Sequence, residues 1–126
     1  MTHWLLKTEP STYAFADLVR EQRTTWDGVS NALALIHLRA MKAGDELFIY
    51  HTGNEKAVVG TARVAAADPH EGRIVITPGR PLPTPVTLAT IKADPAFKAF
   101  GLVKNTRLSA LPVGAGEWQR IVTLGG

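Results

Sequence analysis

The sequence predicts a small α+β domain built around a mixed, barrel-like β-sheet, and three observations lead to this fold class. The chain has 126 residues, which suffices for one hydrophobic core but not for two. Five or six short apolar runs are typical of strands, and short segments with helical spacing separate them. These segments do not form regular β–α–β units, which argues against a parallel α/β sheet. We therefore expect one domain over residues 1–126.

The N-terminal third is expected to contain one strand and two helices. Residues 3–7 (HWLLK) are a short apolar run typical of a strand. After the turn at Pro10, the apolar spacing in residues 13–22 predicts a short helix. Residues 24–30 (TTWDGVS) are interpreted as a loop. A second helix is expected from residue 31, capped by Asn31 or Ser30 and ending at Gly44, with an apolar stripe of Leu33, Ile36, Leu38 and Met41.

The middle of the chain is expected to form three strands. Residues 46–51 (ELFIYH) are nearly all apolar, as in a strand buried on both faces. Residues 56–67 predict another strand, in which Gly60 marks a bulge or a close approach. Residues 73–77 (RIVIT) predict a third. Four prolines follow in residues 78–86 (PGRPLPTPV), which predicts a stiff loop.

The C-terminal part is expected to contain short helices around one more strand. Residues 88–101 indicate two helical segments, broken at Asp94–Pro95 and ending at Gly101. Residues 106–113 (TRLSALPV) predict a strand. Residues 116–124 predict a final helix with Trp118 on its apolar face.

Composition excludes several classes of site. The chain has no cysteine, so disulfides, thiolate chemistry and cysteine-bound zinc are excluded. No two histidines have helical ligand spacing, and there is no dinucleotide-binding or P-loop motif, so we expect no metal and no cofactor. A net charge of +3 permits binding to a polyanion without requiring it. Without a long apolar run or a signal-peptide pattern, we expect no membrane contact and a cytoplasmic, monomeric protein.

The positions of the aromatic residues give the clearest indication of a binding site. Trp4 and Trp118 lie in apolar patterns and are expected in the core, whereas Trp26 stands among polar and turn residues. Trp26 could plug the core or form the wall of a pocket. A set of residue types would suit a base pocket, with an aromatic face for stacking and an amide and an ammonium for polar edges: Lys7, Trp26, Asn31, Tyr50 and His51.

Lys7, Thr8 and Glu9 offer an alternative, in which Thr8 acts as a nucleophile beside a lysine and a carboxylate. In a strand, neighbouring side chains point to opposite faces, so Thr8 would face away from the other two. This counts against catalysis unless the chain bends at Pro10, and an ordinary solvated strand end explains the same residues.

Four blocks together resemble the EVE domain family of the PUA-like superfamily: WLLKTEPSTYAFADL, TTWDGVSNALALIHLRAMKAGDELFIYHT, VVGTARV and TRLSALPVGAGEW. The resemblance runs in order from Trp4 to Trp118. It implies a pseudo-barrel of five or six strands with short flanking helices, and a pocket related to that of YTH domains. It also implies a non-catalytic reader of DNA or RNA, with a modified cytosine or adenine flipped into an aromatic pocket.

The resemblance also assigns residues to that pocket. The ligand-binding set it implies is Lys7, Trp26, Asn31, Tyr50, His51 and Ser109, and the set shaping the pocket or its rim is Glu9, Pro10, Gly28, Val29, Ser30 and Arg107. The chain departs from the family pattern at Ser30, where arginine is usual, and in a shortened segment after residue 64. Both departures bear on ligand choice.

Two further functions stay open beside the reader. ASCH domains, which are also PUA-like, include amidohydrolases that act on acylated nucleosides with Lys, Thr and Glu in the site, and Lys7, Thr8 and Glu9 make this comparison relevant. The other is a sensor of a nucleoside-like molecule or a protein-interaction module.

Overall fold

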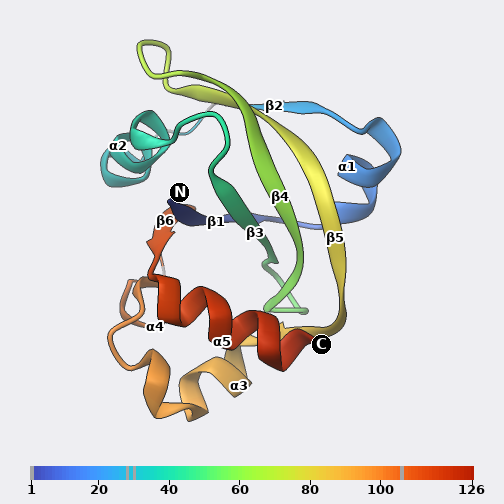
Figure 1. Cartoon of the computed structure of the whole chain (residues 1–126), viewed down its shortest axis with the longest axis vertical. Helices are drawn as coiled ribbons and strands as arrows, with labels where there is room; N and C mark the ends of the chain where they lie inside the picture. The colour runs from blue at the N-terminus through green and yellow to red at the C-terminus, as the bar shows by residue number, and fades with distance from the viewer. Residues whose placement is uncertain (1, 28, 30, 106) are drawn as a thin grey trace.

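The fold is one curled, mixed sheet flanked by short helices (Figure 1), in a computed structural model that describes residues 2–27, 29, 31–105 and 107–126. The strands are β1 (His3–Thr8), β2 (Thr24–Trp26), β3 (Glu46–His51), β4 (Ala57–Asp68), β5 (Arg73–Thr87) and β6 (Ala110–Val113). Their order is β2-β5-β4-β3-β1-β6. Only the β1–β3 pair is parallel, among the pairs in the described residues.

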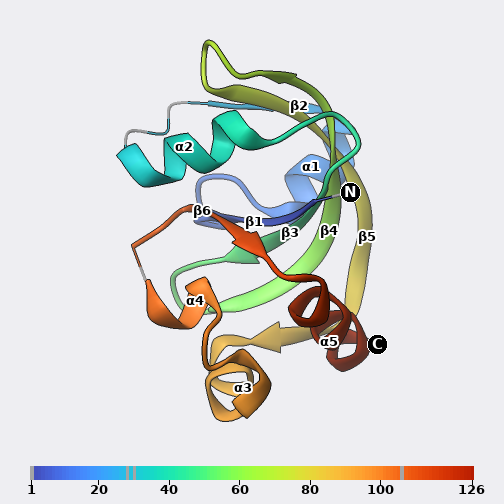
Figure 2. The same cartoon turned by 60° about the vertical axis from the view of Figure 1, so that its left-hand side comes forward.

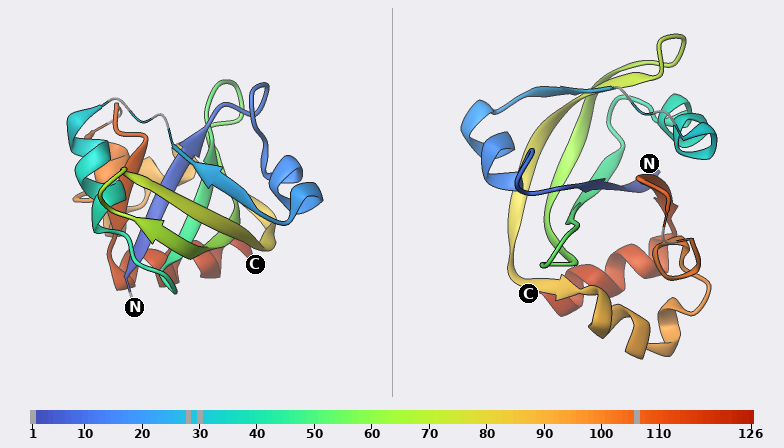
Figure 3. Two further views of the ribbon diagram at one scale, coloured as in Figure 1. Left: turned by 90° about the horizontal axis from the view of Figure 1, so that it is seen from above. Right: turned by 180° about the vertical axis from the view of Figure 1, so that it is seen from behind.

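Short helices connect and cover these strands. They are α1 (Phe15–Glu21), α2 (Ala32–Ala40), α3 (Leu88–Ala93), the 3-10 helix η1 (Pro95–Phe97), α4 (Gly101–Lys104) and α5 (Ala115–Gly125). The sheet curls into a half-barrel, with α2 at one end and α3, α4 and α5 at the other (Figures 2 and 3). This confirms the predicted α+β pseudo-barrel. None of the helices in the described part of the chain is long and apolar enough to cross a membrane.

The core lies on both faces of the central strands. Trp4 and Phe48 point to opposite sides, because Trp4 pairs with Leu47 and side chains alternate along a strand. On one side, the ring of Phe48 stacks on Trp118 of α5, with centroids 3.8 Å apart. On the other, Trp4 contacts His37 of α2 and donates from Nε1 to Asp45 Oδ2 at 2.9 Å. The prediction that Trp4 and Trp118 belong to the core is confirmed.

Helix α2 begins where predicted, but only Leu38 and Met41 of the predicted apolar stripe are buried. Asn31 caps it, since its side chain accepts a hydrogen bond from the Ala34 N–H at 2.9 Å. The buried residues are Ala34 and Leu38, whereas Leu33 is 43% exposed and Ile36 is 60% exposed. The predicted stripe was therefore half wrong. The helix packs on β6 and β5 through the small side chain of Ala34, and the larger Leu33 beside it faces outward.

The predicted proline loop is part of a strand. Strand β5 continues to Thr87. It bulges away from β4 between the pairs Val58–Val86 and Gly60–Pro81, where four residues of β5 lie opposite one residue of β4. Prolines are tolerated in such bulges and on a free edge, since neither needs a donated N–H. Over the described residues, β5 meets β2 only at residues 74–76, so its proline-rich half has a free edge on that side.

Smaller differences concern three other segments. Residues 24–26, interpreted as a loop, form the edge strand β2. Gly101 begins α4 rather than ending a helix, and α2 ends at Ala40, before Gly44. Gly60 is a close approach as predicted, because a Cβ there would lie 2.5 Å from the Phe15 ring.

Candidate nucleic-acid interface

A hollow of about 550 Å³ lies where the two edges of the half-barrel approach each other. Edge strand β2 contributes one side, the end of β1 and the residue before β6 contribute another, and the loop entering α2 closes it. We call it the Trp26 pocket. Its lining residues are Lys7, Thr8, Thr12, Tyr13, Thr24, Thr25, Trp26, Asp27, Val29, Asn31 and Ser109.

Trp26 and Tyr13 form the aromatic part of this pocket. Trp26 is half-buried and meets the Tyr13 ring edge-on, with centroids 6.2 Å apart and planes at 80°. The Tyr13 hydroxyl donates to Glu21 Oε1 at 2.7 Å, which ties this ring to α1. Its indole N–H stays available for other contacts, since no described residue accepts a hydrogen bond from Trp26 Nε1.

Asn31, Asp27 and Thr8 give the pocket a defined polar pattern. The Asn31 oxygen caps α2 and the amide nitrogen is not used in the cap, so the side chain can offer a ligand the two N–H donors of Nδ2. The exposed Asp27 carboxylate offers only acceptors when ionised. Thr8 Oγ1 donates to the Tyr13 carbonyl at 2.6 Å, so this hydroxyl can offer a ligand only its lone pairs.

Lys7 lines the Trp26 pocket from the end of β1. Its backbone N–H donates to the Ser109 carbonyl at 2.8 Å, which fixes both residues on one wall. Its ammonium lies 5.9 Å from the centre of the Tyr50 ring, within cation–π range. Burial lowers the pKa of Lys7, because a desolvated ammonium is less favourable.

Tyr50 and His51 lie outside the lining of the Trp26 pocket. Tyr50 instead lines a neighbouring hollow together with Lys7. His51 is buried, and its Nε2 accepts from the Phe15 N–H at 3.0 Å, so Nδ1 carries the proton toward Glu55 Oε2, also at 3.0 Å. Both ring nitrogens thus hold β3, α1 and the following loop together.

The expected rim residues are spread over a wider area. Val29 lines the Trp26 pocket, whereas Arg107 is exposed and outside its lining. Glu9, in the turn with Pro10, accepts hydrogen bonds from the Ser11 N–H and from Thr52 Oγ1. Hydrogen bonding, first from the Ser11 backbone, lowers the pKa of Glu9. Two further expected rim residues, Gly28 and Ser30, lie outside the described residues.

Sequence reasoning missed Thr12, Tyr13, Thr24, Thr25 and Asp27 as lining residues. Three of them, Thr24, Thr25 and Asp27, lie in or directly after β2, whose pairing with β5 as an edge strand was not predicted. A usable signal was present, since Thr-Thr-Trp is rich in residues that favour strands.

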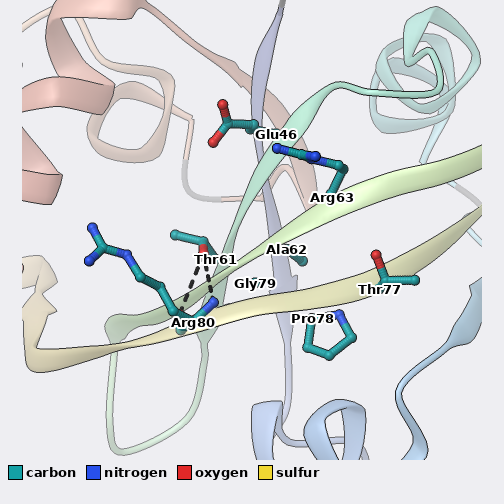
Figure 4. Close-up of a pocket in the computed structure, with 8 residues that line it drawn as sticks. All are labelled: Glu46, Thr61, Ala62, Arg63, Thr77, Pro78, Gly79 and Arg80. Carbon is teal, nitrogen blue, oxygen red and sulfur yellow. Dashed lines mark hydrogen bonds between the residues drawn. The ribbon is translucent and has the colours of Figure 1, made fainter.

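A separate hollow of about 420 Å³ lies over β3, β4 and β5 (Figure 4). It includes Glu46, Arg63 and Arg80, and Thr61 Oγ1 accepts from the Arg80 N–H at 3.0 Å. It contains no aromatic ring, so it offers no surface on which a base can stack. Within the described ranges, no group of three or more His, Cys, Asp or Glu residues could hold a metal ion.

Known proteins include relatives of part of this sequence. The human thymocyte nuclear protein 1 is 37% identical over 50% of this chain, and the matched part spans 33% of that protein. The chain thus spans about a third of the length of the curated relatives it matches.

Solved structures match over the whole chain. A Rhodopseudomonas palustris structure solved by NMR has a TM-score of 0.93 and 38% identity, covering 100% of this chain and 94% of that one. The human THYN1 protein, solved in complex with DNA containing 5-methylcytosine, has a TM-score of 0.88 and 27% identity, covering 99% and 98%. An ASCH protein of Zymomonas mobilis shares the fold alone, with a TM-score of 0.61 and 13% identity over 98% and 99%.

The sequence profile that describes the EVE domain matches residues 2–124, nearly the whole chain. The matched range includes every lining residue of the Trp26 pocket. The chain therefore belongs to the EVE domain family.

Proposed function

We propose that this domain binds nucleic acid without catalysing a reaction, and reads a modified cytosine or adenine that leaves its stack and enters the Trp26 pocket. The observation that carries the proposal is the half-buried indole on a pocket wall, with its N–H free among the described residues. The structural likeness to human THYN1 bound to DNA containing 5-methylcytosine supports it.

Size and stacking suit a single base. At about 550 Å³, the pocket is within the range of about 300–1,000 Å³ that is usual for small-molecule sites. Stacking on an aromatic side chain stabilises a bound base by about 1–3 kcal/mol. This offsets much of the few kcal/mol that unstacking costs in a duplex, and more of the cost in a single strand.

The polar groups favour a base that carries an exocyclic amine. Asp27 accepts hydrogen bonds, and Asn31 Nδ2 donates them. Cytosine presents an amine donor next to ring acceptors, and adenine does the same, whereas thymine and uracil present a carbonyl in place of the amine. The pair Asp27 and Asn31 therefore complements cytosine or adenine, whereas thymine would place its O4 carbonyl, rather than an amine donor, against the Asp27 carboxylate.

The enzymatic alternative has less support. A Thr8 nucleophile needs a base to take its proton, but Thr8 Oγ1 donates to the Tyr13 carbonyl. Glu9 is engaged with Ser11 and Thr52. The likeness to the ASCH protein extends to the fold only.

Fluorescence anisotropy with matched oligonucleotides tests the proposal. The set contains DNA and RNA, single and double stranded, with unmodified, 5-methyl, 5-hydroxymethyl and N6-methyl bases, at two salt concentrations. We expect tighter binding to one modification, and loss of that preference in Trp26→Ala with an affinity decrease of about 5- to 150-fold, the equivalent of one stacking contact. Trp26→Phe is the matched control and should retain part of the preference.

Two results would contradict the proposal. The first is equal, salt-sensitive binding to every oligonucleotide, which would indicate only a basic surface. The second is hydrolysis of N4-acylated cytidine that Lys7→Ala abolishes, which would identify an amidohydrolase.

A further inference from the structure

A second hollow adjoins the Trp26 pocket and shares Lys7 with it. It measures about 290 Å³ and lies between the end of β3, the β3–β4 loop, α3 and α4. We call it the lysine hollow. Its lining residues are Lys7, Tyr50, Thr52, Gly53, Lys56, Leu88, Lys92 and Leu102.

The lysine hollow has a strong excess of positive charge. Three lysines line it, and its lining contains no aspartate or glutamate. Neither Lys56 nor Lys92 belongs to any ion pair among the described residues. The nearby Glu55 carboxylate is 3.0 Å from His51 Nδ1. Three lysines that line one hollow would attract an anion to it.

Tyr50 contributes a hydroxyl to the same hollow. The residue is only 4% exposed, and no described residue forms a hydrogen bond with its hydroxyl. Since none of the buried polar side-chain atoms in the described residues lacks a partner, this hydroxyl is open to the hollow. Burial raises the pKa of Tyr50, which keeps the O–H as a donor. A donor of this kind, in a hollow that three lysines line, is suited to an anionic oxygen.

The backbone holds Lys56 in an unusual conformation toward this hollow. Its φ of 46° is in the left-handed region, which non-glycine residues rarely adopt. The Lys56 carbonyl accepts from the Leu88 N–H at 2.7 Å, which joins the β3–β4 loop to the start of α3. Helix α3 also carries Lys92, so the two lysines are held by one connected unit. Uncommon backbone conformations of this kind concentrate at binding sites.

We propose that the lysine hollow binds a phosphate of the nucleic-acid strand whose base occupies the Trp26 pocket, with Lys7, Lys56 and Lys92 neutralising the charge and the Tyr50 hydroxyl donating to a phosphate oxygen. This inference rests on the proposed function. The shared Lys7 places the phosphate site directly beside the base pocket. The base pocket then supplies selectivity, and the lysine hollow supplies affinity that does not depend on sequence.

The first test removes two positive charges that lie outside the lining of the Trp26 pocket. In the double variant Lys56→Gln/Lys92→Gln, affinity should fall equally for modified and unmodified oligonucleotides, with the ratio between them unchanged. The slope of log affinity against log salt should become shallower by about 0.7–0.9 for each lost contact. The matched control is Lys98→Gln/Lys104→Gln, which removes two exposed lysines outside the hollow and should leave the slope nearly unchanged.

Tyr50→Phe tests the hydroxyl separately. Because no charge is removed, affinity for both oligonucleotides should fall about 2- to 12-fold while the salt slope stays the same. An unchanged affinity would remove Tyr50 from the site.

A probe without bases separates failure of this inference from failure of the proposed function. An oligomer of abasic sugar phosphates should bind the wild type and Trp26→Ala alike, and should bind Lys56→Gln/Lys92→Gln more weakly. If this pattern is found and the wild type shows no preference for a modified base, the phosphate site is supported and base reading is overturned.

Two outcomes would overturn the phosphate site. One is a clear preference for a modified base in the wild type, together with the same affinity and the same salt slope in Lys56→Gln/Lys92→Gln as in the wild type. The other is tight binding of inorganic phosphate, detected by shifts of the Thr52 and Gly53 amide signals, that the abasic oligomer does not displace. The second result would reassign the hollow to a free phosphate compound.

Discussion

Trp118 and Trp26 occupy opposite kinds of environment in this chain. Trp118 is 9% exposed and stacks on Phe48, so its surface is nearly all used within the protein. Trp26 is half-buried, packs against the rim of the core, lies nearly perpendicular to the Tyr13 ring and borders a hollow. The indole on α5 stabilises the fold, whereas the indole on the edge strand is available to a ligand. The difference follows from where each residue lies in the sheet, since α5 covers a central strand and β2 is an edge.

The largest effect expected from this comparison is on stability. Trp118→Ala should lower the free energy of unfolding by about 3–5 kcal/mol, because it removes the ring that covers Phe48. Urea denaturation followed by circular dichroism measures this change. Trp26→Ala, measured in parallel, should cost clearly less. Equal losses in the two variants would mean that Trp26 is a core residue, and the comparison would fail.

A smaller effect on stability is expected when Trp4 loses its buried hydrogen-bond acceptor, Asp45. Asp45→Ala leaves the Trp4 indole N–H without its acceptor, and the Lys42 N–H loses the same Oδ2 atom. We expect the free energy of unfolding to fall by about 1–3 kcal/mol for the unsatisfied indole donor alone.

Asp45→Asn is the matched control for this effect, because its amide keeps an oxygen that can accept from Trp4. Thermal unfolding of the two variants should rank Asn above Ala. The reverse order would show that the charge of Asp45, rather than its hydrogen bond to Trp4, is what matters.

The smallest expected effect concerns the pH dependence of the region around Trp4. Burial against the core lowers the pKa of His37 from 6.5, so the unfolded chain binds a proton in a window below pH 6.5 in which the folded chain does not. Stability should therefore rise with pH through this window and be fully present above it. Unfolding curves between pH 4.5 and 7.5 measure this, and the rise should be shallower in His37→Gln.

An identical pH profile in wild type and His37→Gln would assign the dependence to other groups. Asp17 and Asp94 have pKa values lowered mainly by backbone hydrogen bonds, and the resulting stability is lost only as pH falls below about 4. Their window is separate from that of His37.

Local patterns predicted the elements whose burial matches their hydrophobicity. Strand β3 is buried along both faces, as its apolar run indicated, and the N-cap of α2 is set by the neighbouring side chain of Asn31. The proline-rich segment of β5 was wrongly predicted as a loop. A free edge and a bulge depend on how β5 pairs with the other strands, and the local sequence does not show this pairing. The α2 stripe was misread because helical spacing alone does not show how closely β6 approaches Ala34.

The site residues also divide into those that were predicted and those whose position depends on the tertiary fold. Lys7, Trp26, Asn31 and Ser109 all line the Trp26 pocket, and the family resemblance implied each of them. The separation of Tyr50 and His51 from that pocket depends on their strand. His51 turns toward the Phe15 N–H of α1, and Tyr50 turns toward the lysines. No sequence spacing encodes these directions, because they depend on which face of β3 each neighbour covers.

The pairing of β1 with β6 affects the order in which this domain is completed. Residues 3–6 pair with residues 110–113, so β1 is synthesised well before the strand that completes its pairing. Until then β1 has an open edge, and the wall that joins Lys7 to Ser109 is missing. A chain synthesised only as far as Ser109 therefore lacks the pairing with β6 that holds this wall, and the Trp26 pocket is completed at the same step that closes the sheet.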